Sequence, residues 1–274
     1  LPFPVPGMIE DKPPYGALPV MRAGDQMRPF DVYRVPFAKE NLDKPLISVV
    51  VMDFGLSQTA TSTVLQSMPV GTAVVLNRTV RGAQDVAAQA HKAGFEIWAD
   101  LAVEPMNYPA DDPGANALFS NASIEQNQDA LYRQLAAFMG YAGVFVSSSS
   151  PYLKNNQDAD FLSRALFSRG LGVMANTDQV DNAFVKNAAS SRAPFFAGAM
   201  IRVDEPSDAV RQMKVAQAQA LKNGYSILVI PPSKGVGLMV QGWIKGLADQ
   251  GIAMAPLSVI AERGLILMAG RTGL

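Results

Sequence analysis

The chain has 274 residues, of which 49% are apolar, and its 23 basic and 24 acidic side chains leave a net charge of -1. This length is sufficient for a substantial core and is typical of one main domain. The charge balance argues against nucleic acid as a partner. The absence of cysteine excludes disulfides, cysteine-ligated zinc and a thiol nucleophile.

The ends and hydropathy of the chain bear on its location. No run of 18 or more apolar residues occurs, so we expect no membrane span within this stretch. The chain opens with Leu1 instead of methionine. We therefore expect that a signal or anchor has been removed from its N-terminus.

Residues 1–45 contain nine prolines. Each proline removes a backbone donor and fixes φ, so long helices and central strands are excluded there. The sequence predicts an extended Pro-rich arm or linker over residues 1–45, followed by one domain at 46–274. Within the arm, residues 29–37 (PFDVYRVPF) are rich in aromatic and β-branched side chains, which indicates a segment strapped onto the domain surface.

From residue 46, short apolar runs alternate with helical periods, the pattern of parallel strands joined by helices. The α/β fold expected first is a closed, distorted or open (β/α) barrel of seven or eight mostly parallel strands, and a doubly wound open sheet is the alternative. Four glycines follow predicted helices where a left-handed cap is needed; they are Gly94, Gly170, Gly224 and Gly251. We expect strands at 47–53, 72–76, 95–101, 143–147, 171–175, 195–199, 226–230 and 252–256. We expect helices at 57–66, 82–93, 123–138, 158–169, 181–189, 207–222 and 236–249.

In such folds the chemistry lies at the carboxyl ends of the strands. Polar side chains follow several predicted strands, and each is also a common cap or turn residue. Asp53 is the strongest candidate, and with Asp100 and Glu104 it could offer three oxygen ligands to Mg²⁺ or Ca²⁺. The remaining polar candidates are Ser147 to Ser150 (Ser147 and Ser149 foremost), Asn176, Thr177, Asp178, Ser233 and Lys234.

General-base chemistry has little support in this chain. The single histidine, His91, lies within a predicted helix away from the strand ends and is expected on the surface. A pair formed by one of the serines at 147–150 with Lys234 could activate a nucleophile, although a serine-rich segment is more often only a loop. No cofactor is expected.

Residues 46–263 resemble the divergent polysaccharide deacetylases, relatives of the NodB-type carbohydrate esterases of bacterial cell envelopes. The clearest match is DLAVEPMNYPADDP at 100–113, which with Gly114 resembles H-L-P-M-E-P followed by a loop ending in D-P-G. VVVMDFGLS at 49–57 resembles an I-D-D-L-G-L element, GVFVSSSS at 143–150 resembles G-V-N-N-H-M-G-S, and SILVIPPS at 226–233 resembles A-I-x-I-G-H-P.

The active-site positions depart from that pattern. The second aspartate of the family pair is Phe54 here, and the three histidines are replaced by Asp100, Ser147 and Pro231, so only Asp53 remains. Metal-dependent deacetylation needs a divalent ion to activate water, held by imidazole and carboxylate ligands. Because a serine hydroxyl is a poor substitute for imidazole, the resemblance implies a pseudoenzyme that has lost this chemistry.

Three functions follow as alternatives. The first is binding of a glycan such as peptidoglycan, or scaffolding of an envelope protein, in the periplasm or cell envelope. Exposed aromatic side chains, with Phe54, Tyr108 and Tyr152 the best candidates, could stack on the sugar rings of such a glycan, although each of these residues is more often packed under a loop. The second is an active hydrolase with a carboxylate-only metal site, and the third is a pure protein-interaction module recruited by the arm.

Overall fold

The computed structural model describes residues 3–267. These residues form two compact units. The first unit consists of 3–33, 99–199 and 261–267, and the second of 34–98 and 200–260. The predicted boundary at residue 45 remains a prediction.

The second unit is built on a sheet whose hydrogen-bonded order is β4-β3-β10-β9, with β11 also pairing β3. These pairings are all parallel. The central strand β3 is buried along its whole length except at Asp53. The strands are β3 (Leu46–Phe54), β4 (Ala73–Leu76), β9 (Ile201–Arg202), β10 (Tyr225–Ile230) and β11 (Ala253–Met254). The helices are η1 (Lys39–Asn41), α2 (Gln58–Ser67), α3 (Ala83–Lys92), η2 (Pro206–Asp208), α8 (Ala209–Asn223), α9 (Lys234–Lys245), η3 (Ala248–Gln250) and α10 (Leu257–Glu262), whose last two residues fall in the first unit.

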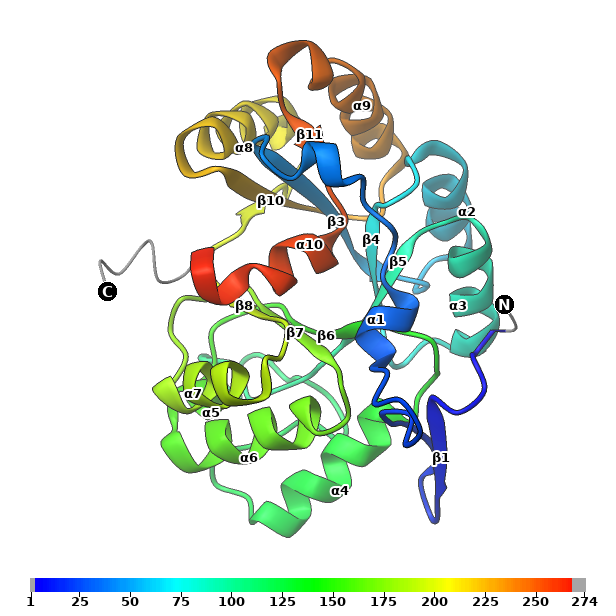
Figure 1. Ribbon diagram of the computed structural model, residues 1–274, viewed down its shortest axis with the longest axis vertical. Coiled ribbons are helices and arrows are strands. Elements are labelled where there is room, and N and C mark those ends of the chain that lie inside the picture. Colours follow the sequence, from blue (N-terminus) through cyan, green and yellow to red (C-terminus); the bar gives the residue numbers. More distant parts are fainter. Residues whose placement is uncertain (1–2, 268–274) are drawn as a thin grey trace. The chain divides into compact units, whose positions relative to one another are not determined.

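Strand β5 (Glu96–Asp100) begins in the second unit and ends in the first. In the first unit, parallel strands follow it in the order β6, β7, β8. They are β6 (Gly143–Val146), β7 (Gly172–Ala175) and β8 (Phe195–Ala197). The helices are α1 (Pro29–Tyr33), α4 (Ile124–Leu135), α5 (Pro151–Lys154), α6 (Asn156–Phe167) and α7 (Asn182–Ser191). Figure 1 shows α6 and α7 next to each other on this unit, followed by α4.

The predicted strand and helix order is confirmed by this arrangement. Ser57 accepts a hydrogen bond from the Ala60 N–H at the start of α2, and Ser123 with Gln126 forms a capping box on α4. The four glycines after helices all have positive φ, as a left-handed cap requires. The two-residue strand β9 and the short helices α5 and α10 were not predicted.

The arm is more structured than the predicted extended strap. Strands β1 (Ile9–Lys12) and β2 (Gly16–Pro19) form an antiparallel hairpin, and 29–33 form the short helix α1. Pro6, Pro13 and Pro14 lie in turns, Pro19 ends β2 and Pro29 is the first residue of α1, and a missing N–H costs little at these positions. Phe30 is fully buried, so residues 29–33 are indeed packed onto the domain, as a helix instead of an extended chain.

No helix among residues 3–267 combines the length and the apolar character needed to cross a membrane.

Candidate functional site

The structure distributes the predicted site residues over both units. Asp53, Phe54 and Lys234 belong to the second unit, and Asp100, Glu104, Tyr108, Ser147, Ser149 and Tyr152 belong to the first.

In the second unit, Asp53 and Lys234 lie at one edge of the sheet. Strands β3 and β10 are parallel with Ile230 opposite Val51, so Asp53, near the end of β3, and the residues that follow β10 lie at the same end of the sheet. Asp53 is exposed and has φ +52°, next to a shift in register between β3 and β4. A positive φ at a non-glycine residue is strained and is often found at functional positions.

In the first unit, the segment after β5 leaves the sheet as a closed loop. The Glu104 N–H donates to the Leu118 carbonyl at 2.7 Å, and the Leu118 N–H donates to the Ala102 carbonyl at 3.1 Å. These bonds join the two stems of the loop. The intervening residues from 106 to 112 are exposed.

Two buried amides on α4 hold this loop in place. Gln134 accepts a hydrogen bond from the Ala102 N–H at 2.7 Å and donates to the carbonyls of Ala102 and Asn116. Asn127 exchanges both hydrogen bonds with the backbone of Phe119. The two amides are seven residues apart and therefore lie on one face of α4. Satisfied buried amides fix a loop geometry, because leaving either one unpaired is costly.

The serine segment at 147–150 is tied to its neighbours. Ser149 and Thr177 share a hydrogen bond between their hydroxyls at 2.8 Å. Ser150 donates to the Glu104 carbonyl and accepts from the Tyr152 N–H at the start of α5. These two hydroxyls thus have local partners, which supports the interpretation of this segment as a turn and helix cap.

Of the three predicted sugar-stacking aromatics, only one is accessible. The expectation that Phe54 and Tyr152 are exposed is wrong, because both side chains are 0% exposed and pack in the core. Tyr108 is 46% exposed. Its ring meets that of Phe119 edge-on at 4.9 Å, which holds it on the loop after β5.

A polar pocket of about 330 Å³ lies next to this loop. Its lining includes Ser120, Ser123, Asn155 and Asp158. Ser120 also donates from its N–H and its hydroxyl to the Glu104 carboxylate, which links the pocket to the loop stem. Such convergent polar groups are typical of small-ligand sites.

Asp158 is the unusual acid of this pocket. It is 7% exposed, and its Oδ2 atom is buried without a hydrogen-bond partner. Burial, and then the charge of Glu104, raises the pKa of Asp158. The buried Tyr152 hydroxyl also lacks a partner, and burial followed by the charge of Asp158 raises its pKa. Neither Asp158 nor Ser120 was predicted as a site residue, since both resemble ordinary helix-start and loop residues in the sequence.

The residues present do not fit a transition-metal centre of the kind the resemblance implies. Among residues 3–267, no three His, Cys, Asp or Glu side chains are grouped so as to hold a metal ion. The single imidazole, His91, is exposed on α3, as predicted. Glu104 binds Ser120, and Asp53 belongs to the other unit.

Comparison with known proteins gives the chain its family context. Residues 49–261 match the sequence model of the divergent polysaccharide deacetylases. An uncharacterized protein from Agrobacterium tumefaciens C58 superimposes with a TM-score of 0.79 at 23% identity, covering 89% of this chain and 98% of that one. A putative cellobiose-phosphate cleavage protein from Enterococcus faecalis V583 gives 0.52 at 10% identity, covering 77% and 96%. No curated protein gives a significant match. The likeness to the first of these structures confirms the predicted α/β fold.

Proposed function

Because the chain belongs to the divergent polysaccharide deacetylase family, we propose that it binds a peptidoglycan-type glycan in the bacterial cell envelope without hydrolysing it. Scaffolding of an envelope protein is compatible with this role. The alternative of an active deacetylase with a carboxylate-only metal site receives no support from the grouping of acidic residues among 3–267.

The proposal rests on the side chains that are available as metal ligands. Activation of water near neutral pH by a bound ion depends on a ligand set that fixes the ion and leaves one position open. The positions that resemble the family's three histidines hold Asp100, Ser147 and Pro231. Proline offers no side-chain donor at all, and a hydroxyl binds such ions weakly.

Glycan binding is supported by an exposed aromatic ring whose contact residue directly precedes a lining residue of a polar pocket. Tyr108 contacts Phe119, and the next residue, Ser120, lines the pocket. A sugar offers an apolar CH face and a rim of hydroxyls. The exposed Tyr108 ring suits the former, and the hydroxyls and carboxyl of the pocket suit the latter.

Tyr108→Ala is expected to weaken binding of a soluble peptidoglycan fragment about tenfold, which corresponds to about 1.4 kcal/mol, the scale of one aromatic contact. Isothermal titration calorimetry measures the effect. Met106→Ala is the matched control, since Met106 is 52% exposed on the same loop but has no ring. Equal losses in the two variants would show that the ring has no special role.

A further inference from the structure

Helix α6 is bordered by three pockets that share lining residues. The 330 Å³ pocket at its start shares Ile124 and Gln157 with a larger pocket of about 860 Å³. That pocket in turn shares Arg164 and Ser168 with one of about 380 Å³ near the end of the helix. All three lie within the first unit, and together we call them the α6 groove.

We propose that the α6 groove binds an extended, uncharged oligosaccharide, of which the pocket lined by Ser120 and Asp158 holds one end. This inference rests on the proposed glycan binding and adds to it the length, charge and path of the ligand. The twelve residues of α6 span about 18 Å. A single sugar cannot fill such a length, whereas a chain of several can.

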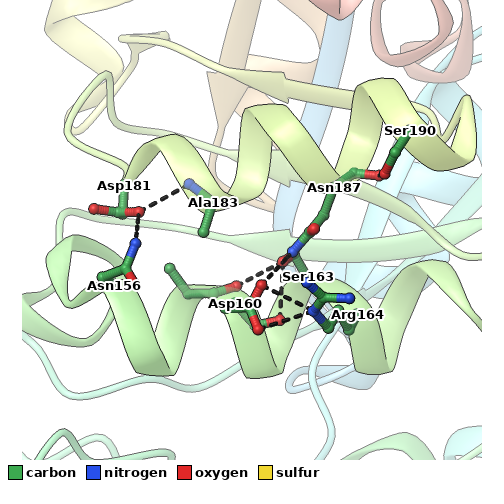
Figure 2. Close-up of polar contacts among 9 residues, drawn as sticks. Asn156, Asp160, Ser163, Arg164, Asp181, Ala183, Asn187 and Ser190 are labelled. Atoms are coloured by element: carbon green, nitrogen blue, oxygen red, sulfur yellow. Dashed lines mark hydrogen bonds and ion pairs between the residues drawn. The ribbon is translucent and has the colours of Figure 1, made fainter.

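The side chains along the groove are held in fixed positions. Asp160 accepts hydrogen bonds from Arg164 Nε at 2.8 Å and from Asn187 Nδ2 at 3.0 Å. Asn187, on α7, also donates to the Ser163 hydroxyl at 2.8 Å. Figure 2 shows Asn187 directed from α7 toward these side chains of α6. Hydrogen bonding by Asn187, and then by Arg164, lowers the pKa of Asp160, so this acceptor stays ionised at neutral pH.

The three arginines of the groove each have a carboxylate partner, and Glu125 and Asp158 add two further carboxyl groups to its lining. Arg164 pairs with Asp160, and Arg169 pairs with Glu10 of the hairpin at 2.8 Å. Arg28, at the far end, pairs with Asp31 at 2.6 Å. Because each of these guanidinium groups has a carboxylate partner, the groove has no surplus positive charge for a polyanion.

The other groups of the groove suit hydroxyl-rich ligands. Three amides, Gln128, Asn156 and Gln157, line the large pocket, and amides can both donate to and accept from sugar hydroxyls. Tyr132 and Phe161 line it as well and provide apolar surface. A neutral chain with many hydroxyls and acetamide groups therefore matches the groove better than an acidic polymer or an apolar peptide.

The dependence of binding affinity on oligosaccharide length tests this proposal. Calorimetry with chitobiose and with chitohexaose, both uncharged N-acetylglucosamine oligomers, should show that the hexamer binds at least about tenfold more tightly. Arg164→Ala should reduce the ratio of the two affinities, hexamer to dimer, to about threefold or less, because it removes a hydrogen-bond donor from the middle of the groove. The Arg164 side chain is 69% exposed, so the variant should fold.

The control is Arg133→Ala, which removes the same kind of i,i+4 arginine–aspartate pair from α4 but does not line the groove. It should leave the ratio unchanged. Two outcomes would contradict binding along the α6 groove and leave the proposal of glycan binding intact. One is equal affinity of the wild type for the two oligomers, and the other is an equal fall in the hexamer-to-dimer affinity ratio in the control variant. Failure of both oligomers and of the peptidoglycan fragment to bind would overturn both proposals. Tighter binding of an isolated stem peptide than of chitohexaose would identify a peptide groove instead.

Discussion

Glu96→Ala is expected to lower the free energy of unfolding by about 3–5 kcal/mol, the cost of leaving several buried donors unpaired. Glu96 is 0% exposed at the start of β5. Its carboxylate accepts hydrogen bonds from Trp98 Nε1 at 2.9 Å, the Ser258 N–H at 2.8 Å and the Val35 N–H at 3.2 Å. Glu96 therefore connects three parts of the chain, namely the segment around Val35, strand β5 and helix α10. Urea unfolding followed by circular dichroism measures the loss.

Glu96→Gln is the matched control and adds a pH test. Glutamine keeps the size and one acceptor, so its cost should be smaller, about 1–2 kcal/mol. Burial raises the pKa of Glu96 above its ordinary 4.5. A carboxyl of this kind stabilises the fold fully at low pH and loses that contribution as the pH rises through the folded-state pKa. The advantage of the wild type over Glu96→Gln should therefore shrink as the pH rises above about 4.5 and through the folded-state pKa. If the stability advantage of the wild type instead grew with rising pH, the raised pKa of Glu96 would be contradicted.

Gly264→Ala is expected to destabilise the first unit by about 3 kcal/mol. A Cβ at this position would overlap the carbonyl oxygen of Phe195 and come within 2.6 Å of its carbonyl carbon. These are backbone atoms of β8, so no side-chain rotation relieves the clash. A large drop in melting temperature is the expected readout.

Gly242→Ala provides the comparison for that variant. Gly242 lies within α9 with no atom near its missing Cβ. Alanine has the higher helix propensity, so this substitution should be neutral or mildly stabilising. Equal effects of the two substitutions would contradict the close approach of residue 264 to β8.

The element order was accessible to sequence reasoning because its signals are local. The buried run of β3 and the capping box at Ser123 and Gln126 depend on residues a few positions apart. The glycines after helices are signals of the same kind, and their positive φ values confirm them.

The parts that sequence reasoning missed depend on contacts between distant segments. The hairpin is fixed by Arg169, which donates to the Glu10 carboxylate and to the Pro19 carbonyl across about 150 positions. Burial of Tyr152 likewise follows from packing that no local pattern encodes. The buried amides Asn127 and Gln134 were the missed signal, since their seven-residue spacing places two polar groups on the inner face of α4.

The candidate site was predictable only in part. The rule that strand ends carry function led to Glu104 and Tyr108, which do lie on the loop after β5. The α6 groove was not expected, because its three pockets flank a helix instead of the strand ends. A helix with exposed Asp160 and Arg164 at i,i+4 resembles any solvated helix face.

The central claim is glycan binding without hydrolysis, and acetate release tests it most directly. Purified protein should release no acetate above the buffer rate from chitohexaose or peptidoglycan, with or without added Zn²⁺, Mg²⁺ or Ca²⁺, while calorimetry on the same sample detects binding. Catalysed acetate release that Asp53→Asn abolishes would contradict the account.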